Sequence, residues 1–382
     1  MSYRWAVLAA GTFAQATYSA IWFGVAVMAP ELRSQYHLSL GETGLLISGS
    51  LVGSVLSLIP WGIATDRFGE RLVLLAGLVG CGGALVAASQ AHAFWPLAAL
   101  LFVAGGVGAS VQSASGRAVM HWFPPSQRGI ALGLRQTAIP LSGFAASLAL
   151  PQILGSGGVA WGFGAMGIAC FVGAAAGALV LREGPQPDRP AVATGSSPLR
   201  DRRIWTLSLG SALVLAPQLC LGGFTVIFLH ERRGLSTGAA AAVLAATQLL
   251  AVAGRIGAGR WSDLRESRVG PLRTIALGAA ALVGVTAALL TAPLLVLVPV
   301  LVAAGVLSMS WNSLSFAAAV ELAGHGRSGL AIGMQQTLLN VPGAAYPALF
   351  GAFVAATSWR AAFAAVALFP LAGRHVLRAL PG

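Results

Sequence analysis

The sequence contains few charged residues and no lysine. Charged residues make up 9% of the 382 residues, whereas hydrophobic residues make up 57%. So little charge leaves too little polar surface to solvate a globule of this length, which excludes a water-soluble protein and indicates an integral membrane protein. All basic side chains are arginine, and they give a net charge of +12 without a basic soluble domain, so we expect no nucleic-acid partner.

Cysteine is scarce and catalytic motifs are missing. Cys81, Cys170 and Cys220 fall singly in three different apolar segments, so we expect buried, inert thiols rather than a disulfide framework or a metal cluster. The sequence shows no Ser/His/Asp set, no paired carboxylates and no phosphate loop. We therefore expect no enzyme activity, no cofactor and no metal. The lack of a nucleotide-binding segment also disfavours primary active transport.

Apolar segments of membrane length fill most of the chain. A helix needs about 20 apolar residues to cross ~30 Å of hydrocarbon. The expected spans are residues 5–29, 43–65, 72–91, 95–120, 129–152, 159–182, 204–229, 237–260, 273–291, 294–319, 328–353 and 357–377. The first span begins at once and is too long for the core of a signal peptide, so we expect no cleavable signal.

The chain also repeats itself after about 200 residues. Residues 129–137 (GIALGLRQT) return as 329–337 (GLAIGMQQT), and residues 31–33 (ELR) return as 231–233 (ERR). Duplicated helical halves in a bilayer are typical of transporters. The repeat therefore predicts two related six-helix halves.

A polar stretch separates these halves. Residues 183–203 are rich in proline and charge at their start, and we expect them to form a cytoplasmic linker. The predicted domains are residues 1–182 and 204–382. The linker is too short to be a folded domain, so any function must reside among the helices.

Arginine is unevenly distributed between the two ends of the expected spans. One side shows only Arg33, Arg232, Arg233 and Arg360, whereas most others, including Arg128, fall on the opposite side. The positive-inside rule then places both termini in the cytoplasm. We expect a multi-pass protein of the cell membrane, which for a bacterium is the inner membrane.

The loop after the second expected span carries a recognisable motif. The segment Gly62-Ile-Ala-Thr-Asp66-Arg67-Phe-Gly69-Glu-Arg71 resembles the signature loop of the major facilitator superfamily. Gly62 allows close helix approach, Asp66 accepts hydrogen bonds at a helix end, and the arginines hold the loop in the cytoplasm. In that family the loop latches the two halves, so the resemblance implies that these residues belong to a gate.

The second half carries a decayed copy of this loop. It reads Gly259-Arg260-Trp-Ser-Asp263, with Leu264 where an arginine is expected, and we assign Arg260 and Asp263 to the gate as well. The resemblance covers essentially the whole chain. It implies an all-α membrane protein of twelve helices in two pseudo-symmetric bundles, which opens alternately to each side.

Two arginines stand out among those within the expected spans. Arg135 is about seven residues inside span 5, and Arg255 is about eight residues before Asp263 in span 8, so each is ~10 to 12 Å from the cytoplasmic edge. Helices 5 and 8 meet between the halves in the family, which implies that both side chains approach one cavity. An arginine in the bilayer costs at least ~2.5 to 3.5 kcal/mol, and no Asp or Glu lies deep in any span. We expect an anionic substrate to supply the compensating charge.

The surroundings of Arg255 resemble those of anion carriers. The segment Gly254-Arg255-Ile-Gly-Ala-Gly-Arg-Trp-Ser-Asp263 is similar to helix 8 of the monocarboxylate, oxalate/formate and nitrate carriers, which implies that Arg255 faces the substrate. Arg135 is not placed by that pattern. Two alternatives stay open: Arg255 can snorkel to the interface, and Arg135 can bind helix carbonyls as part of a gate.

Several uncharged polar residues are weaker candidates for substrate contact. They are Gln15 and Tyr18 of span 1, Gln112 of span 4, Gln218 of span 7, Trp311 and Asn312 of span 10, and Gln335 of span 11. Gln112 and Asn312 are repeat partners, and Gln335 is the repeat partner of Arg135 and should share its face. Each can instead hydrogen-bond one helix to another.

Together these features predict a secondary or facilitative transporter of a small organic anion, such as a mono- or dicarboxylate. Proton co-transport, exchange and facilitated diffusion stay open, and one chain holds both halves, so we expect a functional monomer. The alternative is a proton-coupled drug or metabolite efflux antiporter. Such antiporters resemble one another in an arginine on helix 4 and a glycine before the helix 5 proline, whereas here Ile139 precedes Pro140. A receptor or scaffold without transport is a third possibility.

Overall fold

The part of the chain that the structure describes is helical and contains no strand. This computed structural model describes residues 3–124, 131, 133–182, 200–323 and 328–381. The start of the expected fifth span with Arg128, and residues 183–199 of the expected linker, lie outside the described residues. The all-α fold predicted from the sequence is confirmed.

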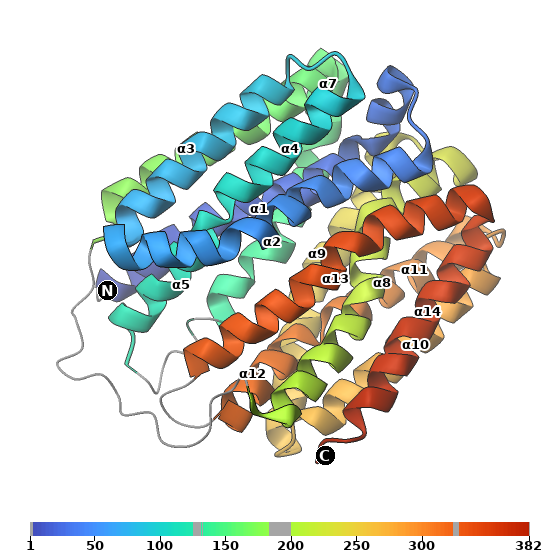
Figure 1. The fold of residues 1–382 in the computed structure, drawn as a ribbon. Helices are drawn as coiled ribbons and strands as arrows, with labels where there is room; N and C mark the ends of the chain where they lie inside the picture. Colours follow the sequence, from blue (N-terminus) through green and yellow to red (C-terminus); the bar gives the residue numbers. More distant parts are fainter. Residues whose placement is uncertain (1–2, 125–130, 132, 183–199, 324–327, 382) are drawn as a thin grey trace. The chain divides into compact units, whose positions relative to one another are not determined.

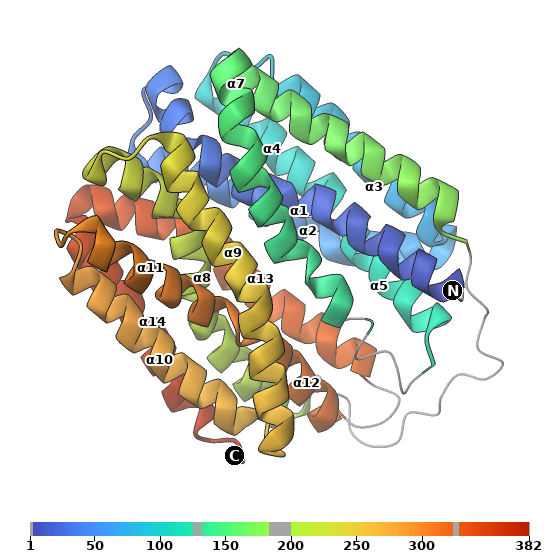
Figure 2. The ribbon, with the colours of Figure 1, turned by 180° about the vertical axis from the view of Figure 1, so that it is seen from behind.

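Two compact units make up the chain, one of residues 1–188 with 226–245 and one of residues 189–225 with 246–382. The division into halves at 182 and 204 stays a prediction. The helices up to the expected linker are α1 Tyr3–Tyr36, α2 Leu40–Phe68, α3 Glu70–Ala88, α4 Phe94–Gly108, α5 Ser110–Trp122 and α7 Ala138–Val180. In this part α1 and α3 both pack against α7, and α2 packs against α4 (Figures 1 and 2).

Seven further helices follow the expected linker. They are α8 Arg202–Arg233, α9 Thr237–Leu264, α10 Val269–Ala288, α11 Leu294–Met309, α12 Asn312–Ala323, α13 Ser328–Ala356 and α14 Trp359–Leu377. Helices α10 and α14 pack along one another over much of their length (Figure 1).

The described helices agree with the twelve predicted spans. Ten segments are long and apolar enough to cross a membrane. One of them, Gly133–Val180, has 48 residues and is interrupted at Gly158, whose φ of 67° breaks the helix, so it holds two predicted spans. Helix α1 is not among the ten because polar residues such as Gln15 lower its hydropathy, although its 34 residues suffice to cross.

Spans 4 and 10 are found as predicted, at Phe94–Val119 and Leu294–Ala323, but each contains an irregularity that the sequence did not reveal. Span 4 is divided into α4 and α5 around Ala109, and span 10 is divided into α11 and α12 at residues 310–311. Glycine is a poor helix former, and three glycines crowd the end of α4. A helix that stops inside a bilayer leaves backbone carbonyls that the protein itself must satisfy.

Side chains from α1 and α2 satisfy the carbonyls at the end of α4. The Tyr18 hydroxyl donates to Gly105 O at 3.0 Å. Ser57 Oγ and Trp61 Nε1 donate to Gly106 O at 2.7 and 2.8 Å. The break therefore ties three helices together.

The expectation of free, buried thiols agrees with the structure, which also brings two of them together. Cys81 Sγ on α3 and Cys170 Sγ on α7 lie 3.8 Å apart because these two helices pack together, although both thiols are free and buried as expected.

Close packing at Gly105 gives a prediction about stability. A Cβ at Gly105 would lie 1.9 Å from Ser50 O, so Gly105→Ala forces α2 and α4 apart, and overpacking of this kind costs ~1 to 3 kcal/mol or more. We expect a clear fall in melting temperature in detergent. The control is Gly83→Ala in α3, where no described atom lies within 4 Å and alanine improves helix propensity. Equal melting temperatures for both variants would contradict this packing account.

Candidate functional site

Arg135 is held against α5 within the first half. Its side chain is 6% exposed, and it lies in helical residues 133–136 just before α7. Its Nε donates to Ser115 Oγ at 2.9 Å, and its Nη2 donates to Gln112 O and Gln112 Oε1 at 3.2 and 3.3 Å. These acceptors are all neutral, so among the described residues the guanidinium charge is bonded to oxygens but not balanced by an acid.

Arg255 is held at the break between α11 and α12. Its Nε donates to the carbonyl of Met309, the last residue of α11, at 3.0 Å. Asn312 Nδ2 donates to the same carbonyl at 3.1 Å and to Gln218 Oε1 of α8 at 3.0 Å. Two residues proposed from the sequence, on α9 and α12, thus meet at one carbonyl oxygen, and a third, on α8, is bonded to Asn312.

Gln335 of α13 occupies a position like that of its repeat partner. Its Nε2 donates to Ser315 Oγ at 2.5 Å, just as Arg135 Nε donates to Ser115 Oγ. Ser315 Oγ also lies 2.6 Å from Ser211 Oγ. The serine contact therefore recurs in both halves, but only the first half has a charge there.

Some buried polar atoms have no protein partner among the described residues. They are found on several predicted site residues, namely Trp311 Nε1, Gln335 Oε1 and Gln15 Oε1. The amide nitrogen of Gln15 is in use, because Nε2 donates to Gln136 Oε1 at 3.1 Å. A desolvated polar atom without a partner costs ~1 to 3 kcal/mol of stability. A polar ligand that bonds to these atoms would recover part of that free energy.

Tyr18 has a structural position instead. It is fully buried, and its hydroxyl bonds Ser54 Oγ and Gly105 O between α1, α2 and α4. Its bonds hold helices together, which leaves it outside the group of residues that meet at the arginines.

The signature loop forms a one-residue connection between α2 and α3. Gly69 has a φ of 79°, which favours glycine, and its N–H donates to Thr65 O at 3.0 Å. Arg67 and Arg71 are exposed, and the Arg67 guanidinium lies 5.3 Å from the Phe68 ring centroid. The side chain of Asp66 lies outside the described part of the structure.

Gly62 does not have the expected role in its own half. No described atom of that half lies within 4 Å of the position that a Cβ would take. Close helix approach is found instead at Gly53 and Gly105, where α2 and α4 pack together.

A buried carboxylate beside this loop was missed by the sequence reasoning. Glu70, the first residue of α3, is 3% exposed, and its Oε1 lies 2.8 Å from His121 Nδ1 of α5. Arg117 lies on the same side, with Nε 3.7 Å from Glu70 Oε1. Nothing in the sequence signals that α3 and α5 meet there.

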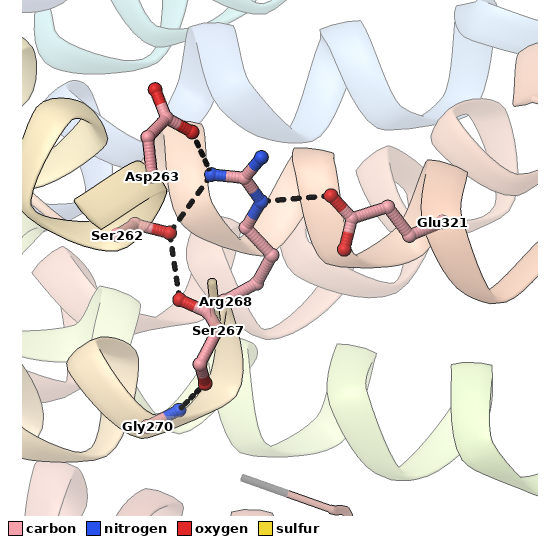
Figure 3. Close-up of polar contacts among 6 residues, drawn as sticks. All are labelled: Ser262, Asp263, Ser267, Arg268, Gly270 and Glu321. Atoms are coloured by element: carbon pink, nitrogen blue, oxygen red, sulfur yellow. Dashed lines mark hydrogen bonds and ion pairs between the residues drawn. The ribbon is translucent and has the colours of Figure 1, made fainter. Parts of the chain in front are cut away.

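In the second half, Arg268 binds the acidic residue of the decayed loop, Asp263. It pairs with Asp263 and, through Nε, with Glu321 Oε1 of α12 at 2.8 Å, while Nη1 donates to Ser262 Oγ at 3.0 Å (Figure 3). Ser262 Oγ in turn donates to Ser267 O at 2.8 Å. Arg260 is exposed and stands apart from this network. The α9–α10 loop is therefore fastened to α12 by an arginine five residues after Asp263.

Ion pairing also joins the C-terminal ends of α1 and α8. Arg33 pairs with Glu231, and Thr237 Oγ1 donates to Glu31 Oε1 at 2.7 Å, all within the first compact unit. The repeat relates 31–33 to 231–233, so this pair links corresponding segments of the two repeats, although not equivalent residues.

The Arg268 network gives a prediction about salt dependence. Arg268→Gln removes two ion pairs, and exposed pairs are worth ~0.2 to 1 kcal/mol each and weaken with salt. We expect a small fall in melting temperature at low ionic strength that disappears in concentrated salt. Arg265→Gln is the control, since it removes the same charge from the same loop at an exposed arginine near the Trp261 ring. A salt-independent fall, or an equal fall in the control, would contradict the network's role.

Known proteins resemble this chain over most of its length. The family model described as Major Facilitator Superfamily matches residues 11–347. An uncharacterised MFS-type transporter of Mycobacterium tuberculosis (strain CDC 1551 / Oshkosh) is 34% identical over 372 residues, which cover 97% of this chain and 83% of the relative. A probable sulfoacetate transporter of Cupriavidus necator is 26% identical over 367 residues, which cover 87% and 83%. A hexuronate transporter of Bacillus subtilis is 30% identical over 121 residues, which cover 31% and 28%.

Solved structures agree on the fold. A bacterial homologue of the human lysosomal transporter Spinster, in an inward-facing and unoccupied conformation, matches with a TM-score of 0.83 over 99% of this chain and 96% of that chain. Its sequence identity is 18%, so this likeness concerns the fold alone. With the family model spanning most of the chain, we conclude that this chain belongs to the Major Facilitator Superfamily of multi-pass membrane transporters.

Proposed function

We propose that this protein transports a small organic anion, a mono- or dicarboxylate or a similar oxyanion, by alternating access. The observation that carries the proposal is the buried guanidinium of Arg135, whose acceptors among the described residues are neutral oxygens. Arg255, whose Nε bonds the Met309 carbonyl, is the second anion-binding group in this proposal.

The distribution of acidic residues supports this proposal. The chain has 11 of them, and none lies in the middle of a described helix. They are Glu31, Glu42, Asp66, Glu70, Glu183, Asp188, Asp201, Glu231, Asp263, Glu266 and Glu321, of which Glu183 and Asp188 lie outside the described residues. A transported anion is therefore a suitable source of negative charge at membrane depth, where an arginine is costly.

The geometry of guanidinium groups also suits this role. A guanidinium carries five N–H donors in a planar fork, and a carbonyl such as Met309 O takes one of them. Carboxylates and sulfonates accept two parallel N–H bonds from such a fork, which favours them over cationic or neutral solutes.

Uncharged groups beside Arg255 are suited to the rest of the substrate. Asn312 and Gln218 are bonded to each other, and Trp311 Nε1 is buried without a partner among the described residues. Hydroxyl or carbonyl groups of an organic acid can bond to such donors and acceptors. The proposal also includes Gln335, Gln112 and Gln15, because their side-chain amides can bond to such groups in the same way.

Two relatives are named for anionic substrates. Sulfoacetate and hexuronate both carry an acidic group that is ionised at neutral pH. We extend the anionic class, but neither compound, to this chain. Proton symport, exchange and facilitated diffusion are all compatible with the proposal, which takes a monomer in the cell membrane, with both termini in the cytoplasm, as the working unit.

Thermal stabilisation by ligands tests this function. A ligand that binds the native state raises the melting temperature. At a concentration of 100 times its Kd it adds about 2.7 kcal/mol to the free energy of unfolding. We expect small carboxylates and sulfonates to stabilise the detergent-purified protein, and expect Arg255→Gln and Arg135→Gln to lose most of that shift. Arg265→Gln, an exposed arginine near the end of α9, should keep the shift.

Each outcome has a distinct meaning. Loss in both Arg255→Gln and Arg135→Gln but not in Arg265→Gln supports anion recognition, and a double variant no worse than either single variant indicates one shared ligand. Stabilisation by cationic or neutral drugs, equal in wild type and variants, would overturn the anion proposal in favour of efflux.

A further inference from the structure

An arginine cluster lies where α10 begins and α14 ends. Arg273 of α10 donates from Nε and Nη2 to Leu377 O at 3.0 and 2.7 Å, and Nη2 also donates to Leu380 O. The last carbonyls of a helix have no partners within it and carry its partial negative charge. Arg273 satisfies them, so the end of α14 no longer repels an anion.

The other two members of the cluster are Arg374 and Arg378. Both have the sign of Arg273 and act on its charge, and Arg378 directly follows Leu377, whose carbonyl Arg273 binds. Arg374 Nε is buried and has no hydrogen-bond partner among the described residues, and no described ion pair includes any of the three. Nearby acids serve another arginine, because Asp263 and Glu321 both pair with Arg268.

Exposed leucines continue from this cluster along both helices. Residues 368, 371, 375 and 378 follow one face of α14 at helical spacing, and Leu368 and Leu371 are 62% and 42% exposed. On α10, Leu277 lies one turn from Arg273 and is 42% exposed. The two helices run side by side (Figures 1 and 2), so the arginines lie at one end of a helix pair that carries exposed leucines.

We propose that Arg374 and Arg378 bind the phosphate of an anionic phospholipid, in the leaflet where α14 ends, while its acyl chains lie along Leu368, Leu371 and Leu277. Charge complementarity selects the anionic headgroup, because three clustered arginines favour a phosphate without a compensating ammonium. The exposed leucines select a lipid over a soluble phosphate, which would gain nothing from apolar contact. The site is separate from Arg135 and Arg255.

Lipid binding to the purified full chain tests this site. Native mass spectrometry of the detergent-solubilised protein would be recorded with phosphatidylglycerol, phosphatidylcholine or inorganic phosphate. We expect phosphatidylglycerol to bind about tenfold or more tightly than phosphatidylcholine, a preference of ~1 kcal/mol per arginine near the surface that weakens with salt. The variant Arg374→Gln/Arg378→Gln should lose it, whereas Arg360→Gln, at the opposite end of α14, should keep it.

Three results would overturn the proposal. One is an unchanged preference in the double variant, and another is competition by inorganic phosphate at equal concentration, which would assign the cluster to a soluble anion. The third needs no variant: wild-type protein without a salt-sensitive preference for phosphatidylglycerol. Anion stabilisation through Arg255 is measured separately, so failure here leaves the transport proposal standing.

Discussion

Backbone carbonyls inside hydrocarbon must find donors within the protein, and this constraint organises both halves of the molecule. Spans 4 and 10 each stop and restart at membrane depth, at the α4–α5 and α11–α12 breaks. In the first half, uncharged donors from α1 and α2 satisfy Gly105 O and Gly106 O. In the second half, Arg255 and Asn312 satisfy Met309 O. The repeat thus keeps the break and changes the chemistry that supports it.

This arrangement connects structure to the proposed transport. In the folded protein, the bond from Arg255 Nε to Met309 O fixes the orientation of the planar guanidinium group. An anion that binds the same guanidinium competes with or reinforces the carbonyl contact. Under the proposed function, substrate binding at Arg255 would be coupled to the geometry of the α11–α12 break, because the same guanidinium bonds Met309 O. Arg135, bonded to Ser115 and Gln112, provides a similar connection to α5.

The sequence predicted the fold well and the polar contacts less well. Hydropathy and the 200-residue repeat are properties of whole segments, so the membrane-length helices were predicted from them, whereas the family was predicted from the resemblance of the loop at residues 62–71. The family and the all-α membrane fold are confirmed. The breaks were missed because the glycines of α4 fit a packing role equally well. Arg268 and the Glu70–His121 pair were missed because their partners come from helices far apart in the sequence. Gln335 was placed through the repeat, which carries three-dimensional information that hydropathy lacks.

Solute flux into proteoliposomes tests the central claim most directly, because it detects electroneutral as well as charge-moving transport. Labelled solute that enters vesicles containing the purified protein is counted against protein-free vesicles. Our account predicts uptake of a small carboxylate or sulfonate, and its loss in Arg255→Gln protein that is reconstituted at equal density. Uptake of cationic solutes alone, or anion uptake unchanged by Arg255→Gln, would contradict it.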